Sequence, residues 1–235
     1  MSTAALRDYG ASSATVSALL ALESTYRDPP EASDQSLVEG LRGGSIVLIV
    51  AAFENYLKES FTEVLERVNV AQPPCDFEKL PIALRTQAVF VGLEYAMKGR
   101  PGSPRGNSAD RLPGVLNAVR RINNRELIAD AIAKTAGNPD SEQVSRIYKI
   151  IGYSSPFTKV RASFDLAWGT PTAVTFIKDT LDIIVARRHV VAHTASILST
   201  SRDDLATWKR FVDTLASVFD AALERQVDRV IERAR

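Results

Sequence analysis

The strongest constraint on the fold is an apolar stripe within residues 34–70. Its members recur every three or four residues, which places them on one face of a helix with about 3.6 residues per turn. Strand signals elsewhere are weak. Such a face must be buried against other elements, so the chain is expected to be an all-α bundle. Gly43–Gly44 precedes the stripe and marks a kink or close packing. The stripe consists of Ile46, Ile49, Val50, Phe53, Leu57, Phe61, Val64 and Leu65.

The same periodicity predicts helices on both sides of this segment. A first helix is expected over residues 12–26, capped by Ser12 or Ser13 and buried on the side of its leucines. Asp140 or Ser141 is the expected cap of a short helix after the turn at Gly137. The apolar stripe of the last helix suits either a core face or a dimer seam. The further helices are expected over residues 76–98, 115–136 (in one or two pieces), 141–152, Pro171–Ile197, and from Thr200 to about Ile231.

Residues 99–114 interrupt the helical pattern. Five glycines and prolines lie between Gly99 and Gly106, and Pro113 follows. We expect an exposed loop insert here. The segment is basic, so it suits either a contact with phosphates or a solvated linker. Its basic residues, with the one before it, are Lys98, Arg100, Arg105 and Arg111.

Composition narrows the class of protein. The 235 residues include 45% hydrophobic side chains, enough for one large helical domain, and the net charge of +1 disfavours a wholly basic nucleic-acid coat. The single cysteine, Cys75, forms no intramolecular disulfide and has no histidine near it, so a small apolar role is expected rather than a nucleophile. Met1–Tyr9 lacks the features of a secretory signal, and the longest apolar run, Ile46–Phe53, is far shorter than the about 20 residues of a membrane span. A cytoplasmic protein without a membrane partner is expected.

Arg188 is an unusual residue in its context. Projected at about 100° per residue, it lies in the middle of the apolar side of its helix. A buried guanidinium needs a carboxylate or a bound anion. Glu54, at the border of the stripe in residues 46–65, is the candidate carboxylate, and a phosphate is the candidate anion. The two roles are compatible. The apolar neighbours are Leu181, Ile184, Val185, Val191, Ala192 and Ala195.

The two histidines of the chain, His189 and His193, are both in the segment Arg187–His193. Their i, i+4 spacing places them on one helix face, which suits half of a metal site, a pair of surface or interface histidines, or an acid–base role. A zinc protease would have glutamate directly after the first histidine, where this chain has Val190. No further histidine exists and the cysteine is distant, so we expect no metal and no other cofactor.

At these residues the sequence resembles HEPN domains. Arg188–His193 matches the arginine–polar–x–x–x–histidine motif of that superfamily. Gly44–Lys58 resembles the early helix of the RiboL-PSP-HEPN branch, and Asn138–Gly152 resembles its middle segment. The helix after Thr200 also fits, so the resemblance spans about residues 36–232.

The resemblance implies a fold of four to five core helices. Residues 1–235 are then one HEPN-like domain, with an N-terminal helix in residues 1–33 and the loop insert at 99–114 as additions.

Many HEPN domains are metal-independent endoribonucleases of toxin–antitoxin or defence systems, and others only bind RNA or protein. The resemblance therefore implies RNA cleavage by the ribose 2′-hydroxyl, with His193 as base or acid and Arg188 stabilising the phosphate. His189 and Glu54 complete the expected catalytic set, and Arg187 is expected to bind substrate. The expected partners are RNA, a second copy of the chain and an antitoxin protein. A catalytically inactive HEPN module that binds RNA or a partner protein is the alternative.

Overall fold

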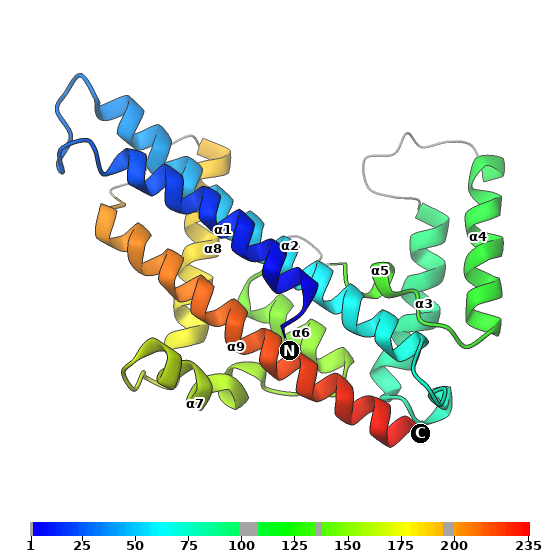
Figure 1. Ribbon diagram of the computed structural model, residues 1–235. Coiled ribbons are helices and arrows are strands. Elements are labelled where there is room, and N and C mark those ends of the chain that lie inside the picture. Colours follow the sequence, from blue (N-terminus) through cyan, green and yellow to red (C-terminus); the bar gives the residue numbers. More distant parts are fainter. Residues whose placement is uncertain (1, 99–107, 135–137, 195–199) are drawn as a thin grey trace.

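Helices form all of the regular secondary structure in the described part of the chain, residues 2–98, 108–134, 138–194 and 200–235 of a computed structural model (Figure 1). The all-α prediction is confirmed. The elements are α1 (Ala4–Glu23), α2 (Gln35–Asn69), the 3-10 turn η1 (Phe77–Lys79), α3 (Ile82–Lys98), α4 (Ser108–Asn123), α5 (Ala129–Ile132), α6 (Ser141–Ile150), α7 (Pro156–Trp168), α8 (Phe176–Thr194) and α9 (Arg202–Ala234).

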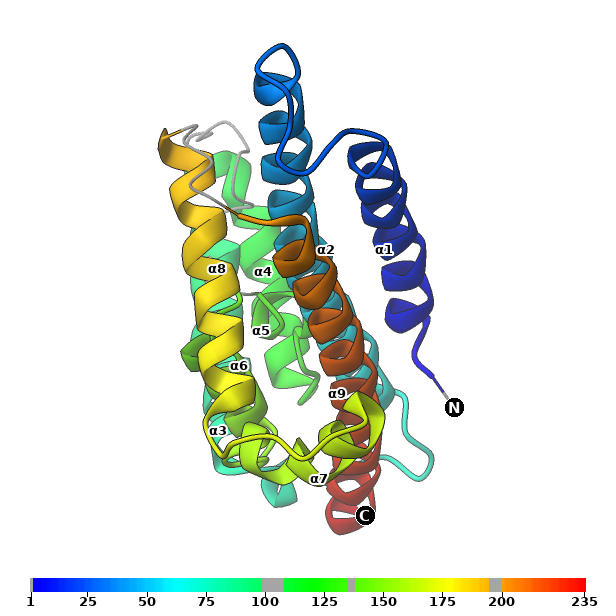
Figure 2. The same ribbon diagram turned by 90° about the vertical axis from the view of Figure 1, so that its left-hand side faces the viewer.

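The long helices α2 and α9 lie side by side and run in the same direction, with α1 packed on one side of them and α8 on the other (Figure 2). The stripe predicted in α2 is buried. By length and composition alone α2 could cross a bilayer, but its apolar side chains pack inside this bundle, as in the core helix of many proteins. The helix is unbroken across Gly43–Gly44, and Gly43 is buried, which agrees with close packing rather than an interruption.

The last helix begins at a capping box, in which the Ser201 hydroxyl accepts from the Asp204 amide and the Asp204 carboxylate accepts from the Ser201 amide. Its apolar stripe is buried within this chain, apart from the half-buried Trp208. The stripe is therefore a core face and not a dimer seam. Tyr148 of α6 packs on Phe219 of this helix, with ring centroids 5.0 Å apart, and so joins α6 to the core.

The predicted first helix had wrong boundaries. It starts at Ala4, capped by Thr3, and its buried side holds Tyr9, Ser13 and Val16, while Leu22 is exposed. Tertiary contacts explain the difference, because the Thr3 amide and hydroxyl donate to the buried carboxylate of Asp220 on α9. These contacts hold the first turn in place.

The predicted loop at 99–114 is also partly wrong. Helix α4 begins at Ser108 and continues through Pro113, while residues 99–107 lie outside the described residues. A proline this close to a helix start removes only one hydrogen bond. On the inner side of α4, Ala118 packs in a small cluster with residues of α3 and α5. The helix lies at one edge of the molecule (Figure 1), and its side chains Leu112 and Leu116 are exposed.

Helix α7 was not predicted, and the helix after it starts later than expected. Pro156 occupies its first turn, and Gly169 ends it with a φ of 92°, a conformation that glycine adopts without strain. Asp165 of α7 accepts hydrogen bonds from the amide and hydroxyl of Thr172. These bonds hold the Pro171 segment as a loop, so α8 begins at Phe176.

Candidate functional site

The candidate site is built on the last two turns of α8. This helix packs against α2 through Leu181, Ile184 and Val185, which are buried. The apolar face of α8 that the sequence predicts is not buried along its whole length, since Val191 is half-buried and Ala192 is exposed. Ala195 and the remainder of the predicted helix lie outside the described residues. The motif therefore lies where α8 emerges from the core.

Arg188 is half-buried and is held by Asn138, whose Oδ1 accepts a hydrogen bond of 2.7 Å from Nη1 of the guanidinium. Its Nε is buried and has no hydrogen-bond partner among the described residues. The sequence indicated Glu54 as a partner. Glu54 is half-buried on α2, the helix that packs against α8. The proximity of Glu54 to Arg188 stays a prediction.

His189 and His193 lie next to each other on the exposed side of α8. Both side chains are exposed, and their ring centroids are 4.3 Å apart at an interplanar angle of 52°. The i, i+4 spacing therefore brings the rings into contact, as the sequence indicated. In the described part of the chain, no group of three or more histidine, cysteine, aspartate or glutamate side chains could hold a metal ion.

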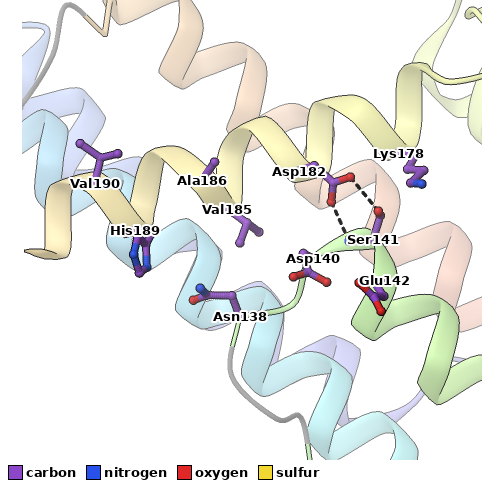
Figure 3. Close-up of a pocket in the computed structure, with 10 residues that line it drawn as sticks. All are labelled: Asn138, Asp140, Ser141, Glu142, Lys178, Asp182, Val185, Ala186, His189 and Val190. Atoms are coloured by element: carbon purple, nitrogen blue, oxygen red, sulfur yellow. Dashed lines mark hydrogen bonds between the residues drawn. The ribbon is translucent and has the colours of Figure 1, made fainter.

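An open pocket of about 600 Å³ adjoins the histidines (Figure 3). It lies between α8 and the segment that leads into α6. His189 and Asn138 both line it and lie near each other, so one end of the pocket reaches both the histidine pair and the residue that holds Arg188 (Figure 3). The complete lining is Asn138, Asp140, Ser141, Glu142, Lys178, Asp182, Val185, Ala186, His189 and Val190.

Asp182 fixes the position of α6 against α8. Its two carboxylate oxygens accept from the Ser141 amide at 2.8 Å and from the Ser141 hydroxyl at 2.7 Å (Figure 3). Asp140 caps the same helix by accepting from the Gln143 amide, which confirms one of the two predicted caps. A carboxylate from a distant helix thus reinforces the local cap, and together they set the wall of the pocket.

Residues 14–225 match the family described as RiboL-PSP-HEPN. The chain belongs to the RiboL-PSP-HEPN family. The match covers most of the chain and includes every element that lines the pocket, which confirms the resemblance seen in the sequence. No curated protein and no solved structure matches the chain.

In this HEPN domain the basic residues of the motif have different surroundings. Arg187 is half-buried, and its side chain makes no hydrogen bond or ion pair within the described residues. Arg188, in contrast, is anchored through Asn138. One arginine is therefore free to reach a phosphate, and the other is held in a defined place.

The structure brings two residues to the HEPN motif that were not singled out as functional. Asn138 holds Arg188, and Asp182 supports the pocket. A signal for each was present, because Asn138 begins the segment that resembles the family and Asp182 shares the helix arc of the two histidines. The sequence alone could not show which helix they would contact.

Cys75 has no part in the site. It is half-buried against the core, and burial raises the pKa of its thiol, so it is mostly protonated and unreactive near neutral pH. This agrees with the structural role expected for it.

Proposed function

We propose that this HEPN protein is a metal-independent endoribonuclease. One observation supports this most directly: at one exposed end of α8, the adjacent His189 and His193 lie beside a half-buried Arg188 that Asn138 holds in place. An anchored arginine suits the charge of a phosphate, and the imidazole rings of histidines can accept and donate protons. RNA fits this arrangement because the ribose 2′-hydroxyl next to each phosphate can act as the nucleophile.

The chemistry needs two proton transfers. A base removes the proton of the ribose 2′-hydroxyl, the oxygen attacks the adjacent phosphorus, and an acid protonates the 5′-oxygen that leaves. The products are a 2′,3′-cyclic phosphate and a 5′-hydroxyl. His193 is the proposed base or acid, with His189 beside it, and Arg188 stabilises the pentacoordinate phosphate. Arg187 contacts a neighbouring phosphate of the RNA, and Glu54 orients Arg188.

A second copy of the chain completes the proposed site. Arg188 and His193 are five residues apart, so they lie about 140° from each other around the helix axis. Two α8 helices that face each other across a twofold axis would place the arginine of one subunit beside the histidine of the other. The exposure of His189 and His193 leaves this face of α8 open to such a partner.

The test is cleavage of RNA by the wild type and His193→Ala, each with and without EDTA. We expect the wild type to cleave equally in both conditions and to leave 2′,3′-cyclic phosphate ends. His193→Ala should be about 10²- to 10⁴-fold slower, because it lacks a proton-transfer group. Sedimentation should show a dimer. Equal rates for both proteins, or activity abolished by EDTA, would contradict the proposal.

In the cell, a nuclease of this kind fits a cytoplasmic toxin or defence protein controlled by an antitoxin. The alternative is an inactive HEPN module that binds RNA or a protein. The carboxylates in the pocket favour a protein as the partner of such a module, because Asp140, Glu142 and Asp182 repel the phosphates of RNA and only Lys178 balances them among the described residues of the pocket lining. A monomer that cleaves no RNA would support this alternative.

A further inference from the structure

The pocket beside the histidines has the volume and the lining of a site for a small, mostly neutral group. Its volume of about 600 Å³ falls within the usual range of small-molecule sites. One wall is apolar and consists of Val185, Ala186 and Val190, and the exposed ring of His189 continues it (Figure 3). Apolar side chains and imidazole rings are surfaces on which nucleobases stack.

The polar groups of the pocket are mainly hydrogen-bond acceptors, and Lys178 is the one ammonium group that its lining contains in the described part of the chain. Asp182 uses both of its oxygens on Ser141. Asp140 uses Oδ1 on the Gln143 amide, while its Oδ2 makes no hydrogen bond within the described residues. A second phosphate would be repelled here, whereas a group that presents N–H donors would be attracted.

We propose that this pocket binds one base of the RNA next to the cleaved phosphate and selects bases with an exocyclic amino group, with Asp140 as the acceptor. This inference rests on the proposed function. Adenine, cytosine and guanine carry such an amino group and uracil does not, and carboxylates accept hydrogen bonds from base amino groups. The position follows from the contacts, because Asn138 links the pocket to Arg188 and His189 links it to His193.

Asp140→Asn is the matched substitution for a test. Asparagine caps helices as well as aspartate does, so its oxygen can still accept from the Gln143 amide. The open Oδ2 acceptor becomes an NH₂ donor. Asp8→Asn is the control, because Asp8 is exposed on α1, on the opposite side of the bundle from α8 (Figure 2).

The probes are fluorescent oligouridines with one adenine, cytosine or guanine nucleotide in the middle, and every ribose carries 2′-fluorine, so no nucleophile is present. Binding is measured by fluorescence anisotropy against the all-uridine oligomer. The wild type and Asp8→Asn should bind at least one amino-bearing probe about tenfold more tightly than the all-uridine probe, as one hydrogen bond to a charged group allows. Asp140→Asn should lose this preference while its thermal unfolding stays unchanged.

Two outcomes would contradict the proposal that the pocket binds a base without contradicting the proposal that the protein is a nuclease. In the first, the wild type cleaves RNA but binds all probes equally. In the second, Asp140→Asn keeps the preference of the wild type. If the wild type neither binds these probes nor cleaves RNA, the proposed function fails, and the base pocket fails with it.

Discussion

At the scale of single residues, the arginine and the histidines depend on neighbours outside the motif. Arg188 is oriented by Asn138, which precedes it by 50 residues in the chain. Asn138 does not lie on α8, and the turn before α6 carries it to the site. A short motif therefore needs a distant amide to hold its arginine in one place.

Asn138→Ala should lower the rate of RNA cleavage by up to about a hundredfold, because the guanidinium of Arg188 loses its hydrogen-bond partner and its position. Asn138→Asp should restore most of the activity, since a carboxylate accepts the same hydrogen bond and adds an ion pair. Cleavage rates and melting temperatures of both variants provide the measurement. Wild-type cleavage by Asn138→Ala would show that Asn138 does not position Arg188.

At the scale of elements, the Asp182 carboxylate links α8 to α6 by two hydrogen bonds. Asp182 holds the amide and the hydroxyl of Ser141, a residue that is almost fully buried. Asp182→Ala should lower the free energy of unfolding by about 1–3 kcal/mol, because it leaves buried donors unpaired. Asp8→Ala, at an exposed position of α1, should change it by less than about 0.5 kcal/mol. Urea unfolding measures both, and equal effects would contradict this role of Asp182.

Another buried carboxylate joins three helices at the end of the bundle where α8 ends. Glu23, at the end of α1, is fully buried and lies 2.6 Å from Arg42 of α2 and 2.7 Å from Arg202 of α9. Arg42 also donates to the Thr200 carbonyl, in the segment that follows α8. The cluster therefore fixes where the chain re-enters the core after the motif.

Glu23→Gln should destabilise the protein by up to about 3–5 kcal/mol, since it removes the negative charge that the two guanidinium groups share and leaves Arg42 with the Asp28 carboxylate as its ion-pair partner. Glu232→Gln, an exposed change on α9, is the matched control and should change stability by less than about 0.5 kcal/mol. Denaturant unfolding of the two variants is the measurement. A loss below about 1 kcal/mol in Glu23→Gln would show that the arginines find other partners.

At the scale of the whole molecule, buried tyrosines make stability depend on alkaline pH. Burial raises the pKa of Tyr56 and Tyr148 well above its ordinary value, and the negative charge of Asp220 adds to the effect. The unfolded chain then binds fewer protons than the folded one above pH about 10, so stability falls as pH rises. The expected slope is about 1.4 kcal/mol per pH unit for each such tyrosine.

Tyr56→Phe should reduce the dependence of stability on alkaline pH by the contribution of one tyrosine, about 1.4 kcal/mol per pH unit. Its hydroxyl is buried near Ser60 but makes no hydrogen bond of normal geometry within the described residues, so its removal should change stability near pH 7 by less than about 1 kcal/mol. Tyr148→Phe should flatten the slope too, but should also cost stability at pH 7, because the Tyr148 hydroxyl donates to the Phe219 carbonyl. Urea unfolding of both variants from pH 7 to pH 11 distinguishes the change in the pH dependence of stability from the loss of stability at pH 7. An unchanged slope in both variants would contradict the assignment.

The sequence by itself determined the helical class, the family and the two histidines as a contacting pair. These follow from periodicity and short-range spacing, which the chain carries within one helix. The buried stripes of α2 and α9 and the Asp140 cap were predictable for the same reason. The start of α1 and the extent of α4 were not, because contacts with distant helices override local signals there.

Only the tertiary structure decided which residues surround the motif. Helical projection showed that Arg188 needs a partner, but it could not indicate Asn138, which the fold brings to Arg188 from the segment before α6. The pocket likewise depends on how α6 and α8 approach each other, which the Asp182–Ser141 contact sets. Side-chain spacing within a helix is a local property, whereas the meeting of two helices depends on the packing of the whole core.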